Sequence, residues 1–133
     1  MNIQVPKTTE RVEQHTKDEI NERMEKEIEQ NIEYYRDKSP DIIKNRIDEL
    51  ESEWDTERVL EANASTLVLA ASVLSLSVNK KWSLLSGIVG GFLLQHAIQG
   101  WCPPLSIIRR AGVRTAAEIN KEKTALDDVL KNN

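Results

Sequence analysis

The sequence is poor in the residues that mark several classes of protein. It contains one Cys in 133 residues, which excludes an intramolecular disulfide framework and a Cys-rich zinc site. Five Gly, four Pro and one Phe argue against a collagen-like, Pro-rich or aromatic-rich β architecture. At 15.2 kDa the chain has room for one modest core, and this size excludes a large multidomain enzyme.

Acidic and basic residues nearly balance over the whole chain but are distributed unevenly. The formal net charge of -4 gives no reason to expect a nucleic-acid partner. Residues 1–61 hold about ten Lys and Arg against about eighteen Asp and Glu, so roughly -8, and the remainder is roughly +4. The mean hydropathy of -0.50, typical of a soluble domain, therefore averages a charged part and a nearly uncharged part.

Two uncharged runs, 62–79 and 82–108, follow the acidic part and are separated only by Lys80 and Lys81. A helix needs about 20 apolar residues to cross a hydrocarbon layer of about 30 Å. We therefore predict a transmembrane hairpin domain at 62–108, with spans at about 62–79 and 82–101. The alternative is a soluble helical interaction protein in which the hairpin is buried in the core of a bundle.

The residue types at the ends and on the faces of these runs support the membrane interpretation. Indole rings prefer the lipid headgroup region, and Lys and Arg mark the edges of a span. Small residues at four-residue spacing let transmembrane helices approach closely, within one hairpin or across a homodimer. The predicted interfacial anchors are Trp82, Trp101, Lys80, Lys81, Arg109, Arg110 and Arg114, and the predicted helix-packing residues are Gly87, Gly91, Ser83, Ala71 and Ser75.

Residues 1–61 are predicted to form an acidic cytoplasmic region of two amphipathic helices, at about 8–37 and 40–61. Ser39-Pro40-Asp41 divides them, because Ser caps a helix and Pro is tolerated at its first position. The apolar stripes are narrow, so the helices should pair with each other or with other copies as a coiled coil. The second helix is expected to run almost without interruption into the first span, with Asn63 and Ser65 as sites for a break. The stripes consist of Ile20, Met24, Ile28, Ile32 and Tyr35, and of Ile43, Ile47, Leu50 and Trp54.

Residues 109–133 are predicted to form a basic turn and a short amphipathic helix. Pro103 and Pro104 are expected to end the second span, and Thr115 and Glu118 have the spacing of a capping box. The helix is expected at the membrane surface or on the stalk that the front helices would form above the membrane. More Lys and Arg flank the ends of the spans that lead to the termini than lie in the turn between the spans, and this difference predicts that both termini are cytoplasmic.

The segment around the end of the second run resembles a known family. Gly100-Trp101-Cys102-Pro103-Pro104-Leu105, followed by Arg109-Arg110-Ala111-Gly112-Val113-Arg114-Thr115, is similar to the YgaP-like inner-membrane domain. The resemblance covers roughly residues 63–126. It implies a bacterial inner-membrane protein with two spans and a tendency to self-associate. Some relatives carry a rhodanese domain, but the front part here has no Cys or Gly-rich loop, so sulfur transfer is not carried over.

Cys102 is the only residue with evident covalent chemistry. As a reactive thiol it would accept a persulfide or acyl group, and the nearby Arg109 and Arg110 would favour a thiolate. No general base is recognisable in the sequence, so the simpler interpretation is a small packing residue before a Pro turn. His96 is interpreted as a hydrogen-bonding helix residue and His15 as an exposed one. No catalytic, cofactor-binding or metal-binding residue is predicted.

The sequence thus predicts an all-α, multi-pass protein of the bacterial inner membrane. Its expected role is that of a membrane anchor and interaction module that self-associates and has no catalytic activity of its own. Membrane lipid, further copies of the chain and an unidentified cytoplasmic protein are the expected partners, without nucleic acid or cofactor. A sulfur-relay or redox accessory protein that uses Cys102 is the alternative from another class.

Overall fold

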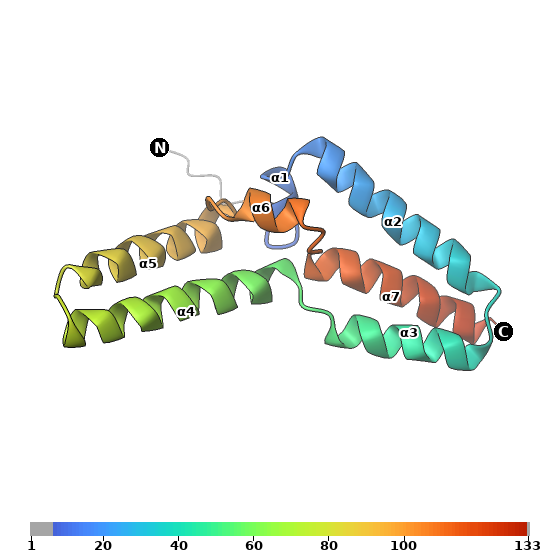
Figure 1. The fold of residues 1–133 in the computed structure, drawn as a ribbon. Coiled ribbons are helices and arrows are strands. Elements are labelled where there is room, and N and C mark those ends of the chain that lie inside the picture. The colour runs from blue at the N-terminus through green and yellow to red at the C-terminus, as the bar shows by residue number, and fades with distance from the viewer. Residues whose placement is uncertain (1–6, 133) are drawn as a thin grey trace.

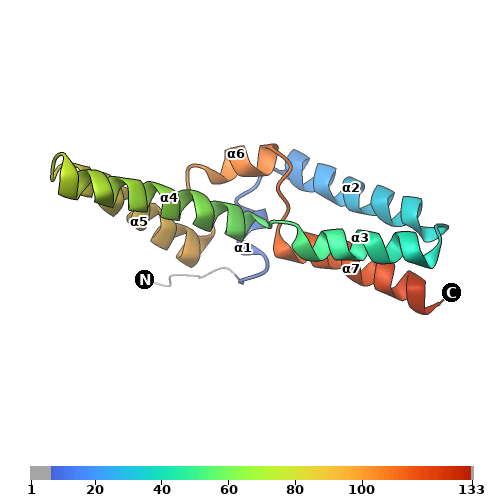
Figure 2. The same cartoon turned by 60° about the horizontal axis from the view of Figure 1, so that its bottom comes forward.

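The computed structural model describes residues 7–132, which are helical and contain no strand (Figure 1). The predicted all-α class is therefore confirmed. The helices pack as two elongated groups that diverge from a common junction (Figures 1 and 2). Their bounds are α1 Arg11–Gln14, α2 Asp18–Arg36, α3 Pro40–Ser52, α4 Thr56–Ser77, α5 Trp82–Gln99, α6 Leu105–Arg110 and α7 Ala116–Lys131.

The first group is the α4–α5 hairpin, in which two antiparallel helices are joined by a short turn. Ala71 lies between them with 1% of its surface exposed. Beside it, the hydroxyls of Ser72 and Ser86 lie 3.5 Å apart, and Ser86 also donates to the carbonyl of Val68 at 3.4 Å. Small side chains therefore allow the two backbones to approach closely, as expected where lipid tails offer no hydrophobic driving force.

The second group is a three-helix arrangement in which α7 packs against both α2 and α3. Each helix contributes an apolar stripe at helical spacing, and the charged residues point outward. The last helix, α7, therefore lies on the front helices. The sequence had left two positions open for it, on the stalk or at the membrane surface. The buried stripe residues are Ile20, Met24 and Ile28 of α2, Ile43, Ile47 and Leu50 of α3, and Ile119 and Leu126 of α7.

Both predicted front helices are interrupted. The expected helix at 8–37 is divided into α1 and α2 around Thr16, whose hydroxyl donates back to Val12 O at 2.7 Å. The expected helix at 40–61 ends at Ser52, and α4 begins after Asp55, whose carboxylate accepts from Arg58 N at 2.8 Å. The continuous stalk was thus wrong, because a side-chain cap restarts the helix before Asn63. Trp54 falls in the connector and is 53% exposed, so it is not part of the stripe.

Several local signals were confirmed. Ser39 occupies the N-cap position of α3, with Pro40 at the first position, although the Ser39 side chain makes no capping hydrogen bond. Thr115 and Glu118 form the predicted capping box of α7. The end of α5 differs from the prediction: Gly100, in the left-handed region at φ +82°, ends the helix before the two prolines. Pro103 and Pro104 instead precede the short helix α6.

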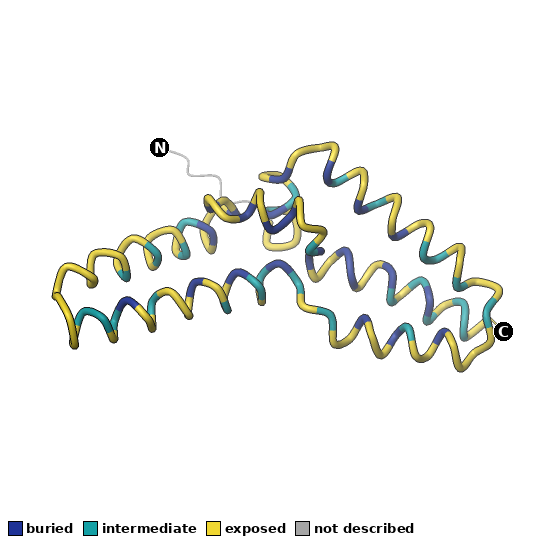
Figure 3. Tube along the Cα trace, viewed as in Figure 1, coloured by how far each residue is buried: buried dark blue, intermediate teal, exposed yellow. Residues whose placement is uncertain are grey.

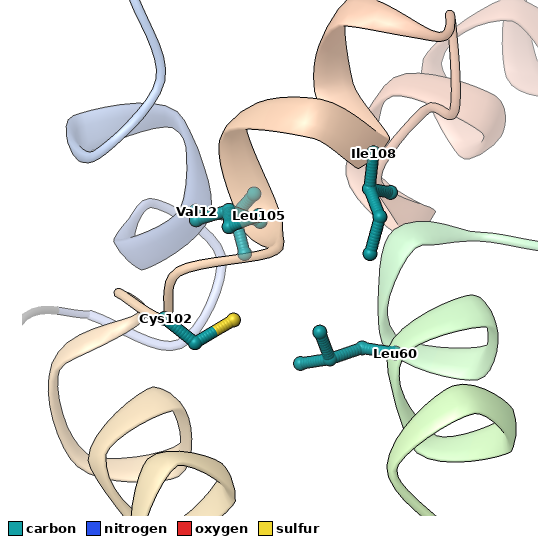
Figure 4. Close-up of a cluster of buried hydrophobic side chains, with 5 residues drawn as sticks. All are labelled: Val12, Leu60, Cys102, Leu105 and Ile108. Atoms are coloured by element: carbon teal, nitrogen blue, oxygen red, sulfur yellow. The ribbon is translucent and has the colours of Figure 1, made fainter. Parts of the chain in front are cut away.

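An apolar cluster at the junction joins the two groups (Figure 4). Val12 of α1, Leu60 of α4, and Leu105 and Ile108 of α6 are buried around Cys102. A Cβ on Gly100 would lie 2.4 Å from the carbonyl oxygen of Arg11, so only glycine lets α1 approach the end of α5 this closely. Helix α1 is therefore part of the same junction.

Candidate functional site

The hairpin exposes apolar surface along most of its length (Figure 3). Only 11% of the apolar window within Pro40–Ser77 is buried, and the uncharged part of this stretch belongs to α4. Within residues 7–132 this is the one helical stretch that is recognised as a membrane span from its own length and mean hydropathy. Helix α5 carries Gln95, His96 and Gln99 in its last turns, which lowers its mean hydropathy.

Several polar groups along the hairpin are satisfied within it. The hydroxyls of Thr66, Ser72 and Ser77 each donate to the carbonyl four residues earlier at 2.7 Å. Gln95 donates to Gln99 at 2.5 Å on α5. Such pairing is what a helix requires in hydrocarbon, where water cannot complete the hydrogen bonds.

The predicted anchors are placed in two different ways. Trp82 and Trp101 flank α5 and are 40% and 42% exposed, while Lys80 and Lys81 are exposed in the turn. Arg110 is exposed as well, and these five side chains are free to contact a headgroup region.

Arg109 and Arg114 are buried, and the prediction that they are interfacial anchors was wrong for these two. Arg109 is fully buried, and all five of its N–H donors find acceptors. Two go to the Glu118 carboxylate, at 2.6 and 2.8 Å. The other acceptors are Thr16 Oγ1, Asn21 Oδ1 and Val113 O, at 3.1 to 3.2 Å. Arg109 thus ties α6 to α2 and α7.

Arg114 makes a second buried ion-pair group with Glu53 and Glu122. It donates to each carboxylate at 2.5 Å, and Arg46 of α3 reaches the other oxygen of Glu122 at 2.9 Å. Burial alone would lower the pKa of Arg114, but hydrogen bonds and attraction from Glu53 and Glu122 outweigh it, and the pKa is raised. The connector before α4 is therefore held to α7 by charge.

The small-residue face predicted for helix packing is divided. Ala71 faces α5 and Ser75 is half-buried, whereas Ser83, Gly87 and Gly91 are exposed. A Cβ on Gly87 or Gly91 would meet nothing within 4 Å. The two glycines are thus not used for packing within the hairpin.

The end of α5 holds a His96–Glu57 pair that the sequence did not reveal. Cys102 and His96 are each 2% exposed. His96 Nε2 lies 2.9 and 3.1 Å from the two carboxylate oxygens of Glu57, and Arg11 donates to Glu57 Oε1 at 2.8 Å. His96 Nδ1 is buried without a well-aligned hydrogen bond. An imidazole of α5 and a carboxylate of α4 therefore form a pair at the base of the hairpin.

Glu57, and Arg11 behind it, are the members of this site that sequence reasoning missed. Glu57 lies 39 positions before His96, and nothing in its surroundings along the chain distinguishes it from the other acidic residues. The one available signal was its place three residues before Leu60, at the start of an apolar run. Arg109, one of the two arginines expected to act on Cys102, is instead paired with Glu118.

An apolar groove of about 590 Å³ opens beside Cys102, between α4, α5 and α6. This size falls within the about 300–1,000 Å³ typical of small-molecule sites. Figure 4 shows the sulfur of Cys102 directed toward Leu60, which also lines the groove. The other wall residues include Ala64, Leu67, Phe92, Leu93 and Ile107.

The part of the chain that the structure describes holds no group of three His, Cys, Asp or Glu side chains placed to bind a metal ion. His15 is exposed at the end of α1, as predicted.

Comparison with known proteins identifies the hairpin segment. Residues 55–118 match the family described as inner membrane protein YgaP-like, transmembrane domain, which confirms the resemblance found in the sequence. The match begins at Asp55, the cap of α4, and ends at Glu118, the partner of Arg109. It therefore contains the His96–Glu57 pair and Cys102. No curated protein and no solved structure matches the chain.

Proposed function

Since residues 55–118 match the YgaP-like transmembrane domain family, we propose that the α4–α5 hairpin crosses the bacterial inner membrane twice and anchors the α2–α3–α7 bundle at its cytoplasmic face. The observation that carries this proposal is the exposed apolar surface of the hairpin, since a soluble protein rarely exposes a large contiguous apolar patch. With 22 and 18 residues, α4 and α5 are about 33 and 27 Å long. Both lengths suit a hydrocarbon layer of about 30 Å.

The position of the bundle supports one orientation. The start of α4 and the end of α5 lie beside the bundle, and the Lys80-Lys81 turn lies at the far end of the hairpin (Figure 1). Two crossings therefore place the bundle and both termini on one side. The bundle side carries most of the Lys and Arg near the spans, so the positive-inside rule assigns it to the cytoplasm.

We further propose that the protein acts by anchoring and interaction, without catalytic turnover. The free Gly87–Gly91 face supports contact with a second copy, because small-residue stripes allow transmembrane helices to pack closely. Exposed acidic side chains of α2, including Glu19, Glu22 and Glu27, offer a surface for a basic cytoplasmic partner.

Alkaline carbonate extraction of membranes tests the anchoring. The protein is expected to stay in the pellet until detergent is added. Release into the aqueous fraction without detergent would instead support the soluble bundle.

Crosslinking in membranes tests self-association. Gly87→Leu combined with Gly91→Leu should abolish the crosslinked dimer, because neither side chain meets an obstacle within its own chain. Ala70→Leu, at an exposed position of α4, is the matched control and should leave the dimer intact. A dimer that persists in the double variant would refute the glycine interface.

A further inference from the structure

We propose that the apolar groove between α4, α5 and α6 holds one acyl chain of an anionic phospholipid, and that Arg110, beyond its cytoplasmic end, binds the headgroup. The proposal rests on the proposed anchoring, because only a hairpin inserted in the bilayer meets phospholipid along this groove. It goes beyond that anchoring, because it assigns one class of lipid to one site.

The groove opens toward the surface that the hairpin presents to lipid. Its wall on α4 runs from Leu60 to Leu67, which is about 10 Å along the helix. Leu67, Ile88 and Phe92 line the groove and are 50%, 48% and 41% exposed, so the groove is continuous with the exposed apolar surface of the hairpin. At its inner end, Leu60 and Ile108 are directed toward the same space (Figure 4). A flexible hydrocarbon chain can therefore enter the groove sideways from the bilayer.

Two side chains with strong hydrogen-bonding groups, Asn63 and Thr66, line the groove, both in the first half of α4. The Thr66 hydroxyl already donates to Ala62 O at 2.7 Å. Asn63 is exposed, and its amide can donate to the ester or phosphate oxygens of a lipid. Glu61, the acidic residue of α4 that is nearest in sequence, lies about 160° around the helix from Asn63. The groove thus offers apolar walls to a chain and a donor to the polar group that follows it.

Positive charge beyond the groove favours an anionic headgroup. Ile107 lines the groove and is 72% exposed, and Arg110 follows it by one turn on the same face of α6. The Arg110 side chain is exposed, and within residues 7–132 it forms no ion pair. Arg23 of α2 donates to Arg110 O at 3.0 Å, which brings a second exposed guanidinium group to the same place. Glu19 and Glu27 lie one turn to either side of Arg23, and in the described part of the chain neither pairs with it.

These groups occur in the order in which a phospholipid presents its parts. The hydrocarbon walls come first, the Asn63 amide lies at the level of the ester groups, and Arg110 follows at the headgroup. A basic group at the cytoplasmic end of a cleft between transmembrane helices attracts anionic lipid in this way. The surrounding apolar surface contacts lipid of any headgroup, whereas this site distinguishes one class from another.

Native mass spectrometry of the full chain in detergent micelles tests the headgroup. The probes are palmitoyl-oleoyl-phosphatidylglycerol and the phosphatidylcholine with the same chains. The protein should bind one phosphatidylglycerol about fivefold more tightly than phosphatidylcholine, since one basic residue near a membrane surface contributes about that factor. Arg110→Gln should remove this preference. Arg58→Gln is the matched control and should retain it, because Arg58 is an exposed arginine of α4 that does not line the groove.

A groove variant tests the acyl chain separately. Thr66 lines the groove but is exposed, so Thr66→Trp should obstruct the groove without disturbing the core. It should weaken the binding of both lipids about tenfold, since displacing only two methylene groups from an apolar site costs about that factor. Ser65→Trp is the matched control, because Ser65 is also exposed but lies about 100° around α4 from Thr66. It should leave both affinities unchanged.

Four results would overturn the proposal. They are equal binding of the two lipids by the unmodified protein, a preference retained in Arg110→Gln, unchanged binding by Thr66→Trp, and a dimer that excludes both lipids, which would assign the groove to a second copy. Carbonate extraction is unaffected by any of them, so failure of this proposal is distinguishable from failure of the anchoring proposal.

Discussion

The buried pair between Arg109 and Glu118 should dominate the stability of the junction. Arg109 is fully buried, its two bonds to Glu118 measure 2.6 and 2.8 Å, and the same carboxylate accepts from Thr115 N at 3.0 Å. Glu118→Gln keeps the size and one acceptor oxygen but leaves the buried guanidinium charge uncompensated. Removing one partner of such a pair costs about 3–5 kcal/mol.

Hydrogen exchange of the α7 amides in the detergent-solubilised protein measures this loss. A loss of about 3–5 kcal/mol corresponds to exchange that is roughly 10²- to 10⁴-fold faster, since each 1.36 kcal/mol is a factor of ten. Glu33→Gln is the control, because Glu33 and its partner Arg36 are 70% and 57% exposed. An exposed pair contributes about 0.2–1 kcal/mol. If Glu118→Gln altered exchange no more than Glu33→Gln, the assignment of a dominant buried pair would be wrong.

Three further predictions concern positions with contrasting environments. Gly100→Ala should lower the melting temperature far more than Gly112→Ala. Both glycines have positive φ, where a Cβ costs about 1 kcal/mol, but only at Gly100 would the added Cβ also meet backbone atoms. Equal effects of the two substitutions in thermal melts would contradict this. Ala71→Leu should destabilise the hairpin by about 1–3 kcal/mol through overpacking, whereas Gly87→Leu should not, as unfolding titrations can measure. If Ala71→Leu left the stability unchanged, Ala71 would not be packed against α5 as described. Burial, and then repulsion from Glu118, raises the pKa of Glu13. Its ionisation therefore opposes folding above the raised pKa, so Glu13→Gln should stabilise the protein at pH 7 by less than about 1 kcal/mol, and the difference should vanish below the ordinary pKa of 4.5. If the difference in melting temperature between Glu13→Gln and the unmodified protein grew toward acid pH, the pKa of Glu13 would be lowered on folding and this prediction would be wrong.

The features that the sequence predicted well depend on neighbours along the chain. The Thr115–Glu118 capping box needs only a three-residue spacing, and the N-cap at Ser39 needs only the Pro that follows. The apolar stripes of α2 and α3 follow from helical periodicity. The uncharged runs predicted the hairpin helices because their length and composition are local properties as well.

The features that the sequence did not predict depend on contacts between distant residues. Arg109 was interpreted as a headgroup anchor because it follows an apolar run, but its acceptors come from Thr16, Asn21 and Glu118 on other helices. His96 gained a carboxylate partner only when α4 and α5 were placed side by side, because Glu57 is 39 positions away. Periodicity could predict that α7 has a buried face, but not that this face lies against both α2 and α3.

The central claim is that the α4–α5 hairpin crosses the membrane twice and leaves both termini on the cytoplasmic side. Single cysteines at Asn79, in the turn, and at Lys44, on exposed α3, placed in a Cys102→Ala background, test it directly. In intact spheroplasts, a membrane-impermeant maleimide should label Asn79→Cys at once and Lys44→Cys only after the membrane is permeabilised. If both positions were labelled together, or both only after permeabilisation, the hairpin would not span the bilayer as described.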